Sequence, residues 1–217
     1  GVHVERLINE PSAAALYYQM TYGKKDGCIM VIDFGGGTLD VSIVECFENI
    51  IEIIGIAGDN PLGGNDVDHE IAQFFCRQNG ISLENLSNEE RAILYKQAEK
   101  AKIMLSANEI ATMVLVAQNK EYRLILTNKL MAEICNDLFQ RIKKIINQAV
   151  KNCSRRPAID NVVLVGGSGK LTALQKYLSD LFGRQVYAAP EPEKAIALGL
   201  GVYAGIKLRD EQMQDIV

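Results

Sequence analysis

The sequence is poor in the features that mark several large classes of protein. Its five cysteines form no CxxC pair and have no Cys/His ligand spacing, so they are predicted to be small core residues in a reducing compartment: Cys28, Cys46, Cys76, Cys135 and Cys153. The isolated His3 and His69 are predicted to be neither ligands nor bases. No apolar run approaches the roughly 18 residues of a membrane span, and the first residues lack a signal-peptide pattern. We expect a soluble, cytoplasmic protein without a membrane partner.

Basic charge is nowhere concentrated. The net charge is -4 and the Lys and Arg residues are dispersed, which excludes the basic stripe that nucleic-acid phosphates require. The length of 217 residues and the hydrophobic content of 48% are typical of a globular chain with one domain or two small ones. The chain begins with Gly1 and enters a predicted helix near Pro11, so we expect an excised fragment.

The first part of the chain predicts a helix followed by three strands. Good helix formers follow Pro11 and end before Gly23. The run CIMVIDF is continuous and apolar, as expected of a central strand covered on both faces. LDVSIVEC and IIEIIGIAG follow after short connections and predict an antiparallel meander.

The segment GDNPLGGND breaks this pattern and predicts a subdomain boundary. After it, helical spacing returns from Val67, and Ser87 with Glu90 has the arrangement of a capping box that opens a long helix. MVLVA and EYRLILT predict a hairpin around Gln118 to Lys120. Thr127 is predicted to cap a third long helix with one apolar stripe, made of Ile134, Leu138, Ile142, Ile145 and Ala149.

The remaining chain alternates between strand and helix. NVVLV is followed by a glycine turn, a helix from about Lys170 to Phe182, the short strand RQVYAA, and a helix from Pro192 to about Ile206. The chain therefore predicts one α/β domain with an insert at about residues 65–135.

A first glycine turn lies in VIDFGGGTLD, between Asp33 and Asp40. Three adjacent glycines cost folding entropy, so close backbone approach to a phosphate explains them better than a flexible hairpin turn, which remains the alternative. Carboxylates beside such a loop suit a hydrated Mg²⁺, which keeps most of its waters.

A second glycine turn lies in VLVGGSGKLT. It is not a Walker A loop, because the required first glycine falls at Leu164 and Leu171 replaces the Ser or Thr that would contact magnesium. A nucleotide-binding turn is predicted, and a plain turn with glycines for close packing is the alternative.

One helical triplet carries polar groups on a shared face. Glu99, Lys102 and Ser106 are spaced i, i+3, i+7. Alone, this triplet is most simply a solvated ion pair with a nearby serine.

Taken together, these segments resemble the nucleotide-binding domain of the Hsp70 (DnaK-type) chaperones. LINEPSAAAL, VIDFGGGTLD, AGDNPLGGND, AEKAKIMLS, VLVGGSGK and PEKAIALGLGVYAG occur in the family's order and at its spacings. The resemblance implies an actin-like ATPase (ribonuclease H-like) α/β fold of two lobes with ATP or ADP between them, of which this chain resembles the second. It implies a connecting helix at 1–26, a base subdomain (IIA-like) at 27–63 and 136–217, and an inserted α+β upper subdomain (IIB-like) at 64–135.

The resemblance also implies site residues. Gly35, Gly36, Gly37 and Thr38 would hold the β- and γ-phosphates. Asp33 and Asp40 would orient metal-bound or attacking water, and Glu10 would join Asp33 in binding Mg²⁺ through water. The adenosine would be contacted by Glu99, Lys102, Ser106, Gly166, Gly167, Ser168 and the stem of Lys170. The family usually has Arg at 170 and Asp-Glu at 193 and 194, where this chain has Lys170, Glu193 and Lys194; these departures suggest a divergent bacterial-type paralogue.

By the same resemblance, the parent protein would hydrolyse ATP to control peptide binding and protein folding. Its partners would be unfolded peptide clients on a C-terminal domain, a J-domain co-chaperone, and a nucleotide-exchange factor on the upper subdomain. The first lobe's phosphate loop has no counterpart here, so the fragment is expected to bind nucleotide weakly and to be inactive alone. The alternatives are a sugar or acetate kinase of the same superfamily, a filament-forming ATPase, and a docking module for an exchange factor.

Overall fold

The computed structural model describes residues 4, 6–23, 26–47 and 50–214, without the side chains of 208–214; His3 lies outside the described residues. Its larger sheet has five strands in the order β3-β2-β1-β6-β7. The bounds are β1 Gly27–Phe34, β2 Leu39–Phe47, β3 Ile50–Asp59, β6 Ile159–Val165 and β7 Tyr187–Ala188. Strands β1, β2 and β3 form the expected antiparallel meander, whereas β6 and β7 run parallel to β1 and make the sheet mixed.

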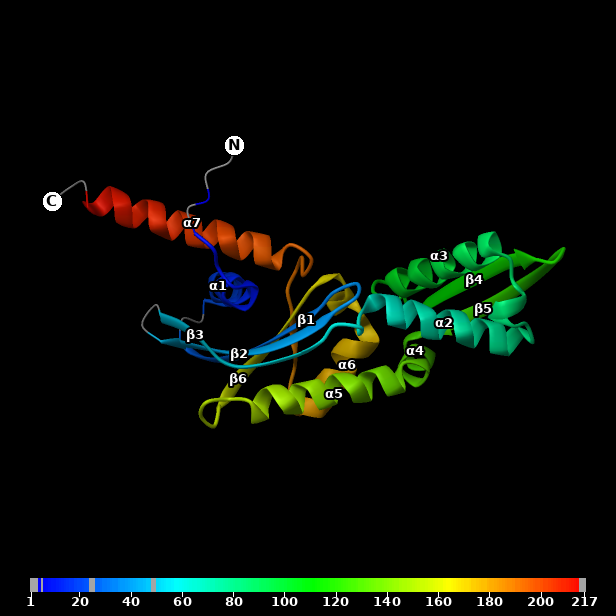
Figure 1. Cartoon of the computed structure of the whole chain (residues 1–217), viewed down its shortest axis with the longest axis horizontal. Coiled ribbons are helices and arrows are strands. Elements are labelled where there is room, and N and C mark those ends of the chain that lie inside the picture. Colours follow the sequence, from blue (N-terminus) through cyan, green and yellow to red (C-terminus); the bar gives the residue numbers. More distant parts are fainter. Residues whose placement is uncertain (1–3, 5, 24–25, 48–49, 215–217) are drawn as a thin grey trace.

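Strand β1 is buried on both faces because helices cover both sides of the sheet. Met30, Ile32 and Phe34 belong to the core that includes α5 (Asn136–Lys151) and α6 (Thr172–Phe182). On the other face, Ile29 and Val31 pack with α1 (Glu10–Tyr22). Figure 1 shows α1 and α7 (Ala195–Gln214) on one side of the sheet and α5 on the other. The continuous apolar run of β1 is thus explained by its central position.

A second group of elements lies beyond the carboxyl end of β1 (Figure 1). It contains α2 (Gly64–Asn79), the short η1 (Leu83–Asn85), α3 (Asn88–Met104), β4 (Ile110–Ala117), β5 (Lys120–Thr127) and α4 (Asn128–Ile134). The predicted capping box is confirmed, because the Glu90 N–H donates to Ser87 Oγ at 3.1 Å and the Ser87 N–H to Glu90 Oε2 at 2.8 Å. The hairpin is confirmed too, and both of its turn residues, Gln118 and Asn119, have positive φ.

The predicted single helix from Thr127 is wrong. Thr127 does cap a helix, accepting from the Leu130 N–H at 3.2 Å, but that helix is α4 and it ends at Ile134. Cys135 has φ -91° and ψ 9°, outside the helical region, and α5 begins after it. The predicted apolar stripe faces the core on both sides of the break: Leu138, Ile142 and Ala149 are buried, and Ile134 and Ile145 are partly buried against the same core.

Two further boundaries differ from the sequence predictions. A 3-10 turn (η2, Gly167–Lys170) follows the second glycine turn, and α6 begins at Thr172 instead of Lys170. The last helix begins at Ala195, later than Pro192, and continues to Gln214, beyond Ile206. Helix ends are the least certain part of any sequence prediction, because tertiary contacts decide them.

The prediction of core cysteines is confirmed. All five are free thiols, four are buried and Cys153 is partly buried. Burial raises the pKa of Cys28 to about 11 and that of Cys135 to about 12, which suppresses their thiolate forms. Among the described residues, no helix combines the length and apolarity needed to cross a bilayer.

The packing of α7 on α1 supplies a test of the fold. A Cβ built at Gly199 would overlap the backbone oxygen of Ala13, whereas one at Gly201 would meet nothing within 4 Å. We expect Gly199→Ala to destabilise the chain by about 1 to 3 kcal/mol, as overpacking does. The matched Gly201→Ala should stabilise it by up to about 1 kcal/mol, because alanine favours the helix. Urea unfolding measures both, and equal effects would contradict the close α1 to α7 contact.

Candidate functional site

The first glycine turn is held against the start of α2 by backbone hydrogen bonds. The Gly64 N–H donates to Gly35 O at 2.9 Å, and the Asn65 N–H donates to Gly36 O at 2.8 Å. Within the turn, the Gly35 N–H donates to Thr38 O at 3.0 Å. The first turn of α2 thus uses its free N–H groups to fix the carbonyls of the loop.

Fixing these carbonyls also fixes the donors of the loop. In a planar trans peptide, the N–H of a residue points opposite to the preceding carbonyl. The Gly36 and Gly37 N–H groups therefore point away from α2, and within the described chain neither has an acceptor. Both donors are therefore available to an acceptor that approaches from outside the chain.

The glycines near this loop divide into two groups. Some are required by the fold: a Cβ at Gly63 would lie 2.5 Å from Gly37 N, and one at Gly64 would overlap Ser168 Oγ. Gly166 has φ +81°, and its Cβ would lie 2.5 Å from Asp33 Oδ1. By contrast, a Cβ at Gly36 or Gly167 would meet nothing within 4 Å, and neither has positive φ. Internal packing therefore explains the first group but not Gly36 and Gly167, which leave room for an external group.

The second glycine turn is tied directly to the first. The Ser168 hydroxyl donates to Gly35 O at 2.9 Å, and the Gly166 N–H donates to Pro192 O at 2.9 Å. The two turns therefore meet at the carboxyl ends of the neighbouring parallel strands β1 and β6. Ser168 makes a bond that supports the loop.

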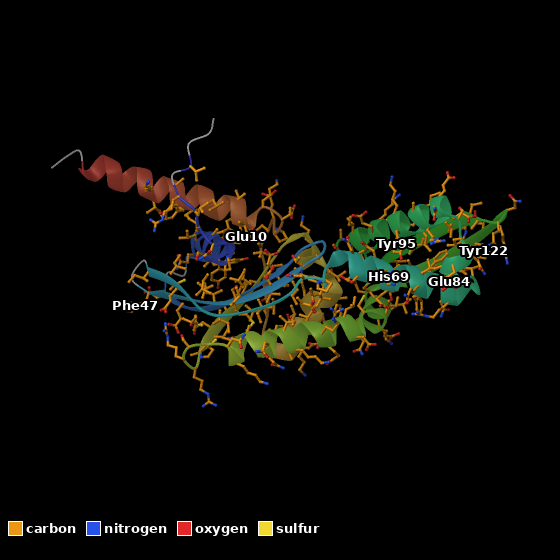
Figure 2. The ribbon with its side chains drawn as sticks, viewed as in Figure 1. Glu10, Phe47, His69, Glu84, Tyr95 and Tyr122 are labelled. Carbon is orange, nitrogen blue, oxygen red and sulfur yellow. The ribbon has the colours of Figure 1, made fainter. Side chains whose placement is uncertain are left out.

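Three carboxylates line a single pocket beside the first turn. Asp33 and Asp40 stand directly opposite each other on β1 and β2, and Glu10 lies in the first turn of α1. All three line a cavity of about 330 Å³, together with Asn9, Pro11, Ala14, Val31, Ser42, Ile53, Ile56, Val165 and Ile196. Figure 2 shows Glu10 on α1, over the sheet. Thr38 lies in the loop between β1 and β2, and its Oγ1 would be 3.7 Å from a Cβ built at Gly35.

This crowding of negative charge changes the acidity of Asp33. Burial, followed by the negative charges of Glu10 and Asp40, raises its pKa to about 6. A cation in the pocket would relieve these costs. Within the described residues, no three His, Cys, Asp or Glu side chains lie close enough to hold a metal directly. Glu10, Asp33 and Asp40 offer only oxygen donors, the kind of ligand that Mg²⁺ takes.

Glu99, Lys102 and Ser106 do not form the simple solvated ion pair with a nearby serine that is the plainest interpretation of their spacing. Lys102 Nζ donates to Asp68 Oδ2 at 2.7 Å and to Gly64 O at 2.9 Å. The side chains of Lys102 and Asp68 are only 13% and 9% exposed, and burial raises the pKa of Asp68 although Lys102 lowers it. Lys102 therefore ties α3 to the start of α2, while Glu99 is exposed and Ser106 half-buried. The prediction that all three lie on one helical face is wrong for Ser106, because α3 ends at Met104 and Ser106 lies in the turn that follows.

Lys170, the last residue of η2, forms an ion pair with Glu193. Lys170 Nζ donates to Glu193 Oε1 at 2.8 Å, and this exposed pair lowers the pKa of Glu193. Lys194 pairs instead with Glu191.

His69 is engaged by neighbours on α2 and α3. Its Nδ1 lies 2.6 Å from the Tyr95 hydroxyl and its Nε2 lies 2.7 Å from Gln73 Nε2. Figure 2 shows His69 and Tyr95 on the second group of elements, which contains α2 and α3. Its contact with Tyr95 joins α2 to α3.

The comparisons with known proteins decide the family. The family model described as Hsp70 protein matches residues 1–217, which is the whole chain. The chain belongs to the Hsp70 family. Its resemblance to the nucleotide-binding domain of DnaK-type chaperones is thereby confirmed, and its α/β architecture is that of the actin-like ATPase fold of Hsp70.

Individual relatives give the same result. The chaperone protein DnaK of Thermosipho melanesiensis is 34% identical over 232 residues, covering 100% of this chain and 38% of the relative. The DnaK of Thermotoga maritima is 35% identical, over 95% of this chain and 36% of the relative. The DnaK of Emiliania huxleyi is 37% identical, over 95% of this chain and 34% of the relative. The chain thus spans little more than a third of the Hsp70 relatives that it matches.

Sequence reasoning missed several residues that shape this Hsp70 site. Gly63 and Gly64 signalled only a boundary, yet their lack of side chains lets α2 reach the loop. Asp68, the partner of Lys102, lies on the helical face that reads as core and carries no local signal. Ser42 lies within a strand that reads as wholly structural.

The charge on Asp33 supplies a test of this part of the Hsp70 fold. A carboxyl group with a raised folded-state pKa loses its contribution to stability as pH rises toward that value. Asparagine carries no charge, so Asp33→Asn does not lose stability in this way as pH rises. The melting temperature of Asp33→Asn should therefore exceed that of the wild type, and the difference should be larger at about pH 7 than at about pH 4.5. The exposed Glu84→Gln is the control and should show no such trend. A gain for Asp33→Asn that is equal at both pH values would show that Asp33 is not strained.

Proposed function

We propose that this chain is the second lobe of the ATP-binding domain of an Hsp70-type chaperone, with the nucleotide's phosphates lying against Gly35 to Thr38. The parent protein would hydrolyse ATP and use the nucleotide state to control peptide binding and protein folding. The loop with its bare N–H groups carries this proposal.

The support from the loop has two parts. The donors of Gly36 and Gly37 point away from α2, and the space at Gly36 is open to an approaching group. Glycine at an exposed turn position with negative φ lowers stability relative to alanine, so Gly36 needs a reason other than the fold. Phosphate oxygens would occupy this space and accept from both donors.

The carboxylates beside the loop suit the metal that accompanies the phosphates. Asp33 and Glu10 would hold Mg²⁺ through its waters, and Asp40 would orient a water on the same side. The ion would supply positive charge for the phosphate oxygens. Thr38 would add a hydroxyl at the mouth of the loop.

The adenosine would lie between the second turn and α3. Gly166, Gly167 and the stem of Lys170 would form one wall, with Glu193 holding the Lys170 ammonium. The other wall would come from Glu99 and Lys102 on α3 and from Ser106 in the turn after it. Lys102 and Ser168 already bond within the chain, so their main part would be to support these walls.

The proposed subdomains follow the two groups of elements. Residues 27–63 and 136–217 would form the base, 64–135 the upper subdomain, and 1–26 the connection to the first lobe. A nucleotide-exchange factor would bind the upper subdomain. Peptide clients and a J-domain co-chaperone would act on the longer parent protein.

The fragment itself would bind nucleotide weakly and hydrolyse it poorly. Phosphoryl transfer depends on charge positioned around the whole γ-phosphate, and this chain provides one side of that cage. Single-turnover ATP hydrolysis by the chain alone measures this, and a rate like that of a complete Hsp70 nucleotide-binding domain would contradict the half-site.

A pair of glycine variants tests the loop. The methyl group of Gly36→Ala would have no atom of the chain within 4 Å, so this variant should fold as the wild type does. The same methyl group should obstruct the phosphates and lower the affinity for Mg·ADP about tenfold or more. Isothermal titration calorimetry measures the affinity, and circular dichroism checks the fold.

Gly63→Ala is the matched structural variant. Its Cβ would press on Gly37 N, so it should lower the melting temperature as well as the affinity. If Gly36→Ala binds Mg·ADP as tightly as the wild type, the phosphates do not lie against this loop.

A further inference from the structure

Asp33 and Asp40 lean away from each other, although their strands hold them directly opposite. A Cβ at Gly166, just after β6, would lie 2.5 Å from Asp33 Oδ1. A Cβ at Gly58, on β3, would lie 2.8 Å from Asp40 Oδ1. Since the strand order is β3-β2-β1-β6, the two carboxylates spread toward opposite edges of the sheet. Like charges facing each other across a strand pair repel, and the two glycines give them room to separate.

Ser42 lies one step deeper on the same face of the sheet. It follows Asp40 by two residues on β2, and its cross-strand partner is Val31. Its side chain lines the same cavity as the two aspartates, but it is only 1% exposed. Among the described residues, its hydroxyl has no hydrogen-bond partner.

An unpartnered buried hydroxyl is unusual, and its surroundings show what would satisfy it. Its cross-strand neighbours Val31 and Ile56 are apolar and offer no side-chain partner. The cavity of about 330 Å³ exceeds the space of about 30 Å³ that one water occupies in the liquid. The site therefore combines an unpaired hydroxyl, two nearby carboxylates and room for a water.

We propose that Ser42 binds an ordered water between Asp33 and Asp40, and so acts as a positioning residue for both carboxylates. Ionised carboxylates only accept hydrogen bonds, so the water donates one hydrogen to each of them. The water oxygen accepts the hydrogen of the Ser42 hydroxyl. Every group then has a partner, and the water's hydrogens separate the two negative charges.

This water gives the carboxylates a fixed orientation before any ligand enters. Its importance for nucleotide binding rests on the proposed function, whereas the water site itself rests only on the cavity. The two claims are therefore tested by separate measurements.

The water is tested by crystal structures of the ligand-free chain, as wild type, Ser42→Ala and Ser42→Thr. We expect a water within about 3 Å of the residue 42 hydroxyl and of one oxygen each of Asp33 and Asp40 in the wild type and in Ser42→Thr. It should be lost or displaced in Ser42→Ala. A wild-type pocket without this water, or the same water in Ser42→Ala, would overturn the proposal.

The positioning role is tested by calorimetric titration with Mg·ADP. Ser42→Ala should bind about fivefold more weakly than the wild type, and Ser42→Thr should restore the affinity to within about twofold. Thr112→Ala, which removes an exposed strand hydroxyl on β4, is the control and should bind as the wild type does.

The outcomes of the titration separate the two claims. Equal affinities for the wild type, Ser42→Ala and Ser42→Thr would overturn the positioning role while leaving the proposed function standing. A wild type that binds no Mg·ADP would contradict the proposed function, and the crystal structures would still decide the water site.

Discussion

Two backbone hydrogen bonds, from Gly64 and Asn65 to the carbonyls of Gly35 and Gly36, are the contact on which the rest of the site depends. They join the end of the central strand to the start of α2, and they turn the next two N–H groups outward. The Gly63 backbone fits against the loop because it has no Cβ. Ser168 and Lys102 complete the arrangement, since one donates to Gly35 O and the other to Gly64 O. The loop is thus held directly by α2 and η2, and α3 holds α2 in place through Lys102.

Negative charges are crowded beside this loop. Asp33 and Asp40 face each other near Glu10, and the raised pKa of Asp33 shows that its ionised form is strained at neutral pH. A structure selected only for stability would not retain this arrangement. The proposed function gives this arrangement a reason, because a cation and phosphates bound beside these residues would balance both the carboxylates and the free N–H groups.

Much of the fold could be predicted because its signals are local. The apolar run of β1, the capping box at Ser87 and the two-residue hairpin turn at Gln118 each depend on neighbouring residues. The break at Cys135 could not be predicted, since helix formers continue through it and tertiary packing sets its backbone. The same division holds for the site. The glycines and aspartates were visible in short motifs, whereas the roles of Gly63, Asp68 and Ser42 arise only when distant segments meet.

The central claim is that the loop donors meet phosphate while the second turn meets adenosine. Amide NMR spectra of the ¹⁵N-labelled chain, titrated in parallel with Mg·ADP and with adenosine, test it most directly. We predict that Mg·ADP shifts the amide signals of Gly36 and Gly37 together with that of Gly167, and that adenosine shifts Gly167 but leaves Gly36 and Gly37 unchanged. Equal shifts of Gly36 and Gly37 with both ligands, or none with Mg·ADP while Gly167 responds, would contradict the claim.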